Sequence, residues 1–190
     1  MMKKIAIFAS GSGTNFQRIA EYFKDNADIK INLLIVNKKD AYAIERAKKL
    51  GIEYIYYSRE DFYSSEKVLN TLKEREIDFI VLAGFLWLMP ENILKQYPNK
   101  IINIHPALLP KFGGKGMYGH NVHQAVVENK EKETGITIHY VNQHYDEGEI
   151  IFQAKCEVLP EDDADMVASK IHLLEQEHFP KIIELVLKGE

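Results

Sequence analysis

The chain has 190 residues, of which 46% are hydrophobic, so it is long enough for one domain with a buried core. Its formal net charge of −4 and its scattered Lys and Arg residues exclude a basic groove, so no nucleic-acid partner is predicted. Cys156, the single cysteine, cannot form an internal disulfide, and no apolar run approaches the roughly 18 residues that span a bilayer. We therefore expect a cytoplasmic protein that does not bind membranes.

The predicted elements begin with short apolar runs that alternate with amphipathic patterns. Nearly continuous apolar runs are typical of strands buried on both faces, and they occur at 5–9, 32–36 and 79–83. Apolar residues that recur every three or four positions predict helices at 42–50 and 60–75. Gly51 stands where a glycine commonly ends a helix. This alternation predicts right-handed βαβ units and an open parallel sheet.

The pattern changes after a strand expected at 100–104. A loop at 106–119, which contains two prolines and four glycines, precedes a short helix near 120–130. Two strands expected at 134–141 and 149–158 lie too close in sequence for another βαβ unit, which favours an antiparallel hairpin or a long connection. A helix follows at about 162–187. The predicted fold is α/β: a single-domain, Rossmann-like, mostly parallel open sheet with helices on both faces and a mixed or antiparallel C-terminal edge.

A glycine-rich turn, Ser10-Gly11-Ser12-Gly13-Thr14-Asn15, follows the first expected strand and opens the first helix. Its glycines allow a sharp turn, and the N–H groups at a helix start point at an anion, so we expect a phosphate here. The alternative is a plain tight turn with a Ser or Thr helix cap. A dinucleotide site would need glycine at position 16 and an acidic residue after the second strand, where Phe16 and Asn37-Lys38-Lys39 stand. We predict a monophosphate ligand and no nicotinamide cofactor.

The strand expected at 100–104 runs directly into His105 and Pro106. A period of two puts Asn103 and His105 on one face, at the carboxyl end of a parallel strand, where open α/β sheets bind their ligands. An amide donor and a histidine can together stabilise an oxygen that becomes negative during attack on a carbonyl carbon. The alternative is a polar pair that is satisfied within the strand end.

Asp146 is the candidate acidic partner of His105, in the loop Tyr145-Asp146-Glu147-Gly148. A carboxylate beside His105 would raise the pKa of the histidine and keep it charged. An aspartate before a glycine is also a common turn residue, and the residues alone do not pair it with His105.

No metal is predicted, because no histidine spacing matches a metal site; we expect His120 and His123 on a solvated helix surface.

Taken together, these segments resemble the folate-dependent glycinamide ribonucleotide formyltransferases over nearly the whole chain. The matching segments are 10–15, 36–38, 81–85, 102–111, 135–139 and 146–148. The string Asn-Ile-His-Pro-Ala-Leu-Leu-Pro at 103–110 is of a type shared by formyl-transferring and deformylating relatives. The glycine-rich first turn favours the purine-pathway enzymes among them.

The resemblance implies roles for particular residues. The implied catalytic residues are Asn103, His105 and Asp146, with His139 close to the aspartate. The implied contacts to glycinamide ribonucleotide are Gly11, Ser12, Gly13, Thr14 and Asn15 around its phosphate and Glu175 at its sugar. The implied folate contacts are Leu86, Trp87, Leu88, Met89, Asn103, Val141, Asn142 and Asp146. The implied organisation is one catalytic domain over 1–190, with a phosphate-binding half at 1–104 and a folate-binding and catalytic half at 105–190.

The implied activity is direct transfer of a formyl group from 10-formyltetrahydrofolate to the amine of glycinamide ribonucleotide, in purine biosynthesis. The implied partners are small molecules only, and the expected state is a monomer or homodimer. Protonated His105 and Asn103 would stabilise the oxyanion, and Asp146 would keep His105 charged and help to move protons. A formyltetrahydrofolate deformylase uses the same trio but usually carries an additional N-terminal regulatory domain. Methionyl-tRNA formyltransferases add a C-terminal domain. A non-catalytic nucleotide-binding module would need the turn but not the trio.

The chain departs from the family pattern at three places. Trp87 stands where members usually carry arginine, and Ser65 stands near where some relatives place a folate-contacting arginine. Both differences bear on how the folate is held. The glycine-containing loop at 112–120 is longer than in some members, which indicates either a mobile lid or simple surface length.

Overall fold

The computed structural model describes all 190 residues and contains a seven-stranded sheet with the strand order β3-β2-β1-β4-β5-β6-β7. The strands are β1 (Lys3–Ala9), β2 (Ile29–Val36), β3 (Glu53–Tyr56), β4 (Phe79–Leu82), β5 (Ile101–His105), β6 (Glu133–Tyr140) and β7 (Ile150–Glu157). Contacts along the chain divide it into two compact units, Met1–Ile102 and Asn103–Glu190. The predicted α/β fold is confirmed, whereas the single domain with halves at 1–104 and 105–190 stays a prediction.

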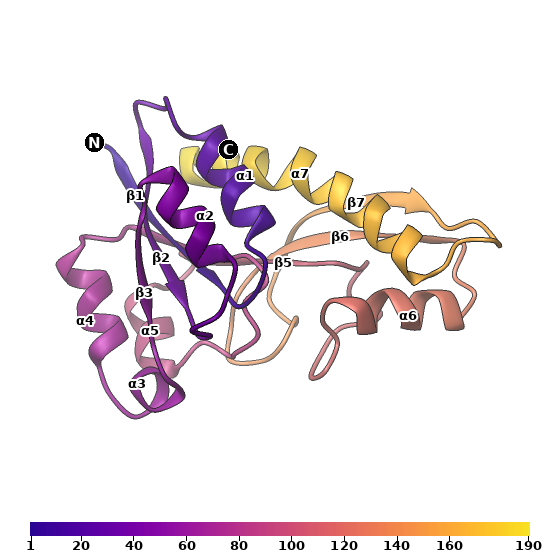
Figure 1. Ribbon diagram of the computed structural model, residues 1–190, viewed down its shortest axis with the longest axis horizontal. Coiled ribbons are helices and arrows are strands. Elements are labelled where there is room, and N and C mark those ends of the chain that lie inside the picture. Colours follow the sequence, from indigo (N-terminus) through magenta and orange to yellow (C-terminus); the bar gives the residue numbers. More distant parts are fainter. The chain divides into compact units, whose positions relative to one another are not determined.

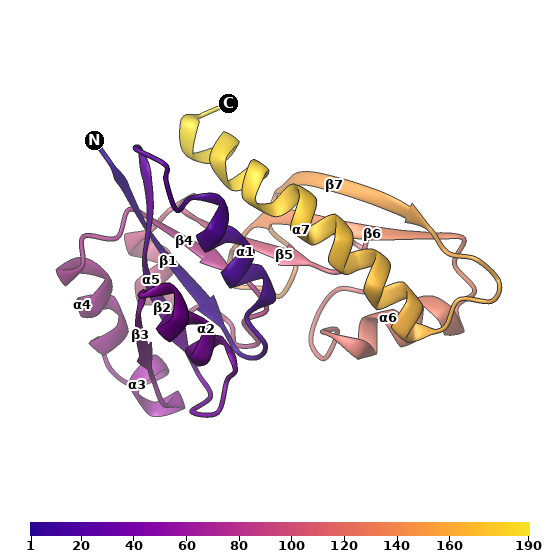
Figure 2. The same cartoon turned by 45° about the horizontal axis from the view of Figure 1, so that its top comes forward.

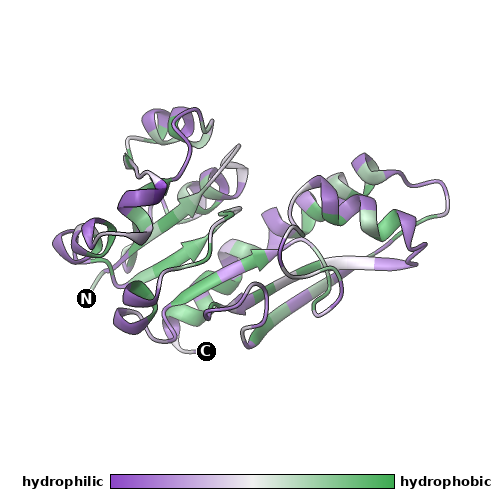
Figure 3. Cartoon of the chain, turned by 90° about the horizontal axis from the view of Figure 1, so that it is seen from below, coloured by the Kyte–Doolittle hydropathy of each residue, from purple (hydrophilic) through white to green (hydrophobic).

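The first unit is built on parallel strands. β1 pairs in parallel with β2 and with β4, and β2 pairs in parallel with β3. Figures 1 and 2 show α1 (Thr14–Tyr22) and α2 (Ala43–Leu50) on one side of these strands and α4 (Lys67–Glu74) on the other. Since helices cover both faces, side chains of both faces must be apolar. Residues 5–9 are accordingly all buried, and Figure 3 shows these strands largely in the colour of hydrophobic residues.

The helix expected at 60–75 is interrupted in the structure. α3 (Arg59–Tyr63) ends before Ser64, and α4 begins only at Lys67. Ser58 caps α3 by accepting a hydrogen bond from the N–H of Asp61 at 3.1 Å, and the hydroxyl of Ser65 donates to the carbonyl of Asp61 at 2.7 Å. The Ser58 bond stabilises the start of α3. The Ser65 hydroxyl bonds the carbonyl that the N–H of the same residue would bond in a continuous helix, so it competes with continuation.

Two short elements, β3 and α5 (Glu91–Gln96), have no counterpart among the predicted elements. The four residues of β3 are exposed or half-buried, so the strand lacks the apolar run that marks buried strands. The predicted helix end at Gly51 is confirmed: this glycine has φ 67° and its N–H bonds back to the last turn of α2.

In the second unit, β6 and β7 pair antiparallel from Glu133 opposite Glu157 to His139 opposite Ile150, as predicted. The helix α7 (Ala164–Lys188) contacts both strands and also α6 (His120–Glu128) (Figure 2). The structure contains no helix with the length and apolar character required for crossing a bilayer.

The expectation that His123 lies on a solvated surface is wrong. His123 is only 7% exposed, because it shares the buried face of α6 with Val122 and Val126. Its Nδ1 atom has no hydrogen-bond partner. Burial lowers the pKa of His123 to about 4, and neighbouring His120, His172 and His105 act in the same direction. His120, by contrast, is exposed as predicted.

Candidate functional site

Asn103, His105 and Asp146 lie together in the second unit. His105 is the last residue of β5, and Asp146 lies in the loop between β6 and β7. Oδ2 of Asp146 is 3.5 Å from Nδ1 of His105, and its Oδ1 is 3.6 Å from Nε2 of His139. Nδ2 of Asn103 is 3.1 Å from the same Nε2 atom. The side chains of both histidines are at most 4% exposed, so water scarcely screens the charges of this cluster.

Backbone groups fix the carboxylate of Asp146. The N–H of Gly114 donates to Oδ2 at 3.0 Å. Asp146 itself has φ 55°, a conformation that Asp and Asn adopt more readily than most residues. Gly148 follows where no side chain fits, since a Cβ there would lie 1.6 Å from the carbonyl oxygen of Tyr140. The loop conformation thus places the carboxylate between the two histidines.

Both ring nitrogens of His105 face acceptors. Nε2 lies 2.7 Å from the carbonyl oxygen of Phe112, and Nδ1 faces Asp146. A neutral ring has one N–H, whereas a protonated ring has two, so these acceptors favour the charged form. Burial opposes them and prevails, and the pKa of His105 is lowered from its ordinary value. Asp146 acts to raise this pKa, as expected, but burial outweighs it, so the net direction of the shift is downward.

Asp146 is the anion of the cluster. Burial acts to raise the pKa of its carboxyl group, but the contact with His139, the charge of His105 and the N–H of Gly114 outweigh burial. The net effect is a pKa below the ordinary value of an aspartate. At neutral pH the group is therefore an acceptor for protons and for N–H groups.

His139 orients Asn103. Its Nδ1 lies 2.8 Å from the carbonyl oxygen of Tyr140, to which it donates a hydrogen bond. Its Nε2 lies 3.1 Å from the amide Nδ2 of Asn103 and 3.6 Å from Oδ1 of Asp146. The ring thus holds the amide nitrogen of Asn103, which has two N–H groups, beside the carboxylate.

In the first unit, the glycine-rich turn joins β1 to α1. Gly13 precedes α1 in the left-handed conformation, with φ 73°, and no side chain caps the helix, so the alternative of a Ser or Thr cap is not what the structure shows. Gly11 and Ser12 are exposed, and Thr14 and Asn15 are half-buried at the helix start. A helix N-terminus preceded by glycines suits an anion.

The segment with the predicted pterin contacts 86–89 follows β4 in the same unit. The buried hydroxyl of Ser10 accepts a hydrogen bond from the N–H of Leu86 at 3.0 Å. Trp87 is half-buried and packs against Phe62, with 5.4 Å between ring centroids. The guanidinium of Arg59 lies 5.6 Å from the centroid of the Trp87 ring. Met89 is buried. Whether these residues contact a folate stays a prediction.

The remaining predicted residues lie after β6, in the segment that leads to Asp146, and on α7. Val141 and Asn142 are half-buried just after β6, and Oδ1 of Asn142 accepts from the N–H of His144 at 2.8 Å. Glu175 is 8% exposed on α7, with its Oε2 3.4 Å from Nδ1 of His172. The loop at 112–120 reaches the trio through Phe112 and Gly114, as described above; its role as a lid stays a prediction.

Sequence reasoning missed three contacts. Two are backbone groups, the carbonyl of Phe112 and the N–H of Gly114, which no side-chain pattern reveals. The third is Arg46 on α2, whose Nε donates to the carbonyl oxygen of Ser12 at 2.7 Å. Arg46 lies 34 positions after Ser12, with no motif that links the two.

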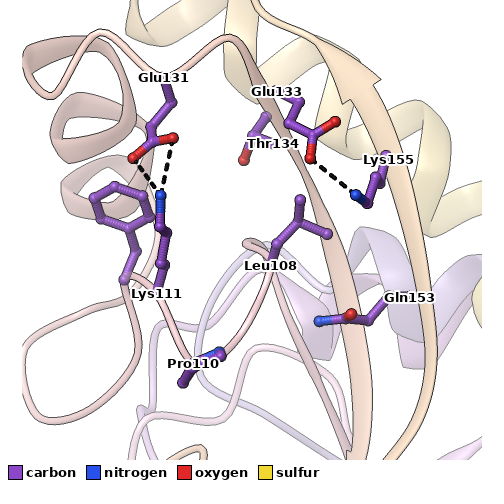
Figure 4. A pocket seen from close by; sticks show the side chains of 9 residues that line it. Leu108, Pro110, Lys111, Glu131, Glu133, Thr134, Gln153 and Lys155 are labelled. Carbon is purple, nitrogen blue, oxygen red and sulfur yellow. Dashed lines mark hydrogen bonds and ion pairs between the residues drawn. The ribbon is translucent and has the colours of Figure 1, made fainter.

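A pocket of about 280 Å³ lies elsewhere in the second unit (Figure 4). It is lined by Leu108, Pro110, Lys111, Phe112, Glu131, Glu133, Thr134, Gln153 and Lys155. Its charged side chains are already paired: Lys111 with Glu131 at 3.0 Å and Lys155 with Glu133 at 2.8 Å. No predicted site residue lines it, although Phe112, whose carbonyl oxygen faces Nε2 of His105, is one of its lining residues.

No group of three or more His, Cys, Asp or Glu side chains is arranged to hold a metal ion. Asp146 lies near two histidines, but its oxygens are 3.5 and 3.6 Å from their nitrogens, and both nitrogens have hydrogen-bonding roles within the cluster. The prediction that the protein needs no metal stays a prediction.

Comparisons with known proteins agree on one family. A family model described as formyl transferase matches residues 3–183. A chloroplastic phosphoribosylglycinamide formyltransferase of Arabidopsis thaliana is 40% identical over 184 residues, which cover 93% of this chain and 62% of the relative. The chain thus spans less than two thirds of that relative's length. A phosphoribosylglycinamide formyltransferase of Haemophilus influenzae is 35% identical over 193 residues, covering 99% of this chain and 89% of the relative.

Solved structures agree with the sequence comparisons. Glycinamide ribonucleotide transformylase 1 from Geobacillus kaustophilus superposes with a TM-score of 0.89 at 35% sequence identity. The match covers 98% of this chain and 100% of that structure.

Proposed function

This chain belongs to the formyl transferase family, and from that premise we propose that it transfers the formyl group of 10-formyltetrahydrofolate to the amine of glycinamide ribonucleotide, as a step of purine biosynthesis. The observation that carries the proposal is the cluster of Asn103, His105 and Asp146, which brings together a donor amide, a titratable ring and a carboxylate. Asp146 lies within 4 Å of both His105 and His139, and Asn103 lies within 4 Å of His139. The named relatives support the choice of substrate.

The reaction begins with attack by the unprotonated amine of glycinamide ribonucleotide on the formyl carbon. A carbon–nitrogen bond forms, and the electron pair of the carbonyl bond moves onto oxygen. Asn103 donates an N–H to this oxygen, and His105 supplies a proton or a positive charge beside it. Negative charge that develops there favours the protonated ring and so opposes the effect of burial on the pKa of His105.

Collapse of the tetrahedral intermediate breaks the bond between the formyl carbon and the folate nitrogen. The attacking nitrogen loses a proton, and the leaving folate nitrogen gains one. Asp146, whose lowered pKa keeps it anionic, accepts or relays this proton together with His105. A low pKa of His105 suits this role, because a proton held there is readily given up.

The substrate contacts of the proposal are those implied by the sequence. The ribonucleotide would bind through Gly11, Ser12, Gly13, Thr14, Asn15 and Glu175. The folate would bind through Leu86, Trp87, Leu88, Met89, Asn103, Val141, Asn142 and Asp146. We further propose that the protein acts in the cytoplasm, on small molecules only and without a metal, as a monomer or homodimer.

The decisive experiment is an assay with 10-formyltetrahydrofolate, with and without glycinamide ribonucleotide. Tetrahydrofolate that forms only when the amine is present supports the transferase. Tetrahydrofolate that forms equally without the amine identifies the deformylase, the nearest alternative. Binding of a phosphorylated ligand without any turnover identifies the nucleotide-binding module.

A further inference from the structure

Two carbonyl groups of the glycine-rich turn are held by α2. The oxygen of Gly11 accepts a hydrogen bond from the N–H of Ala43 at 3.1 Å, and the oxygen of Ser12 accepts one from Nε of Arg46 at 2.7 Å. Neither peptide is cis. In a trans peptide the N–H points away from the C=O, so the N–H groups of Ser12 and Gly13 point away from α2.

We propose that Arg46 is a positioning residue for the phosphate of the amine substrate, an inference that rests on the proposed function of the turn. Its hydrogen bond fixes the peptide between Ser12 and Gly13 so that the N–H of Gly13 faces the phosphate. N–H groups already aimed at an anion need no reorientation on binding. If this peptide rotated, its carbonyl oxygen would face the phosphate and repel it. Arg46 thus acts through the turn.

The guanidinium of Arg46 is held by more than one element. Its Nη1 donates to Oε1 of Gln17 on α1, and its central carbon lies 5.0 Å from the centroid of the Tyr42 ring. Gln17 in turn donates from Nε2 to Glu21 at 2.8 Å. A planar group with separate donors can bond the turn and α1 at the same time, which the single ammonium of a lysine does less well.

The turn also has little room to adjust at this point. A Cβ added to Gly13 would lie 2.6 Å from the Cβ of Ala43, so the backbone of the turn rests directly on the first turn of α2. A change in how α2 holds the turn therefore moves the N–H groups themselves. Arg46 and Ala43 act on adjacent peptides of the same short segment.

The test uses the full chain as wild type, Arg46→Met, Arg46→Lys and the control Lys49→Met. Lys49 is exposed on the same helix, so its variant removes one positive charge without touching the turn. Each protein is assayed with glycinamide ribonucleotide and with the corresponding nucleoside that lacks the phosphate. The comparison separates an effect on phosphate binding from an effect on the fold.

Arg46→Met is expected to raise KM for the ribonucleotide about 10- to 100-fold, with kcat and the kcat/KM for the nucleoside changed by about twofold at most. Lys49→Met is expected to match wild type. Arg46→Lys is expected to recover only part of the loss, because the charge returns without the planar fork.

Three outcomes would overturn the inference: an unchanged KM, an equal loss with both substrates, or complete recovery by Arg46→Lys, which would assign the effect to charge alone. Should Arg46→Met fail to fold, Arg46→Lys decides, since the inference requires weaker binding of inorganic phosphate than in wild type. Calorimetry with inorganic phosphate needs neither amine nor folate. It therefore still tests Arg46 if wild type shows no amine-dependent transfer, a result that refutes the proposed function instead.

Discussion

Asp146 holds its Oδ2 atom 3.5 Å from Nδ1 of His105, in a loop that follows a different strand from the one that ends at the histidine. Each residue changes the proton affinity of the other. The carboxylate acts to raise the pKa of His105, and the histidine acts to lower the pKa of Asp146. Burial works against the charged form of both; it prevails at His105, whose pKa is lowered, but not at Asp146, whose pKa is also lowered.

Replacement of Asp146 by Asn should lower kcat about 100- to 10,000-fold, because the amide cannot accept a proton. The fold should remain, since Asn tolerates φ near 55° about as well as Asp. Steady-state kinetics and a thermal unfolding curve measure the two effects. Glu147→Gln, the same change at the exposed neighbour, is the matched control and should retain wild-type turnover. A near-normal rate for Asp146→Asn would remove this residue from the mechanism.

Gly13→Ala should lower the free energy of unfolding by about 2–4 kcal/mol, because a side chain at φ 73° is strained and its Cβ would meet Ala43. Gly11→Ala is the matched control: nothing lies within 4 Å of a Cβ there, so we expect a change below about 0.5 kcal/mol. Urea unfolding of both variants measures the difference. Equal stability of the two would contradict the packing described here.

His123 should make the protein less stable in acid. Its pKa is about 4 in the fold and about 6.5 in the unfolded chain. Above pH 6.5 both states hold it neutral, and it makes no contribution. Between pH 6.5 and 4 the unfolded chain binds more protons than the folded chain. The free energy of unfolding therefore decreases as the pH is lowered through this range, by up to about 3 kcal/mol.

The variant His123→Leu removes this buried titrating group together with its unpartnered Nδ1. Its free energy of unfolding should vary less between pH 6.5 and 4 than that of wild type. Denaturant titrations at several pH values measure the difference, which isolates His123 from His105, whose lowered pKa acts in the same direction. Parallel pH curves for the two proteins would show that His123 is not the source.

Ser10→Ala should raise KM for the folate more than KM for the amine, because the hydroxyl of Ser10 holds the backbone of the segment at 86–89. Loss of this buried hydrogen bond should cost about 1–2 kcal/mol of stability. Ser169→Ala, which removes an exposed hydroxyl on α7, serves as the control. A larger effect on the amine would place the folate contacts elsewhere.

The predictable parts of the fold are those with strong local patterns. The buried strands around Ile7 and Ile80 have the nearly continuous apolar runs that are typical of parallel strands covered on both faces. The short edge strand β3 has no such run, because solvent reaches it. The break between α3 and α4 involves the hydroxyl group of Ser65, which bonds the carbonyl of Asp61.

In the candidate site, too, some features could be predicted from the sequence and others could not. Period two identified Asn103 and His105 as neighbours on one face, and the resemblance pointed to Asp146 and His139. The net pKa of His105 could not be predicted, because it depends on burial, which a pairing of residue types does not contain. The partners Phe112 and Gly114 act through their backbones, where residue identity says little.

The position of β7 at the end of the strand order has a consequence for how molecules of this protein meet. A terminal strand offers unpaired backbone groups to which another chain can add. Lys155 and Glu157 are exposed along β7, and Lys155 is paired with Glu133 across to β6. A second molecule that added a strand to this sheet edge would have to desolvate those charges. The edge therefore resists strand addition and aggregation at high concentration.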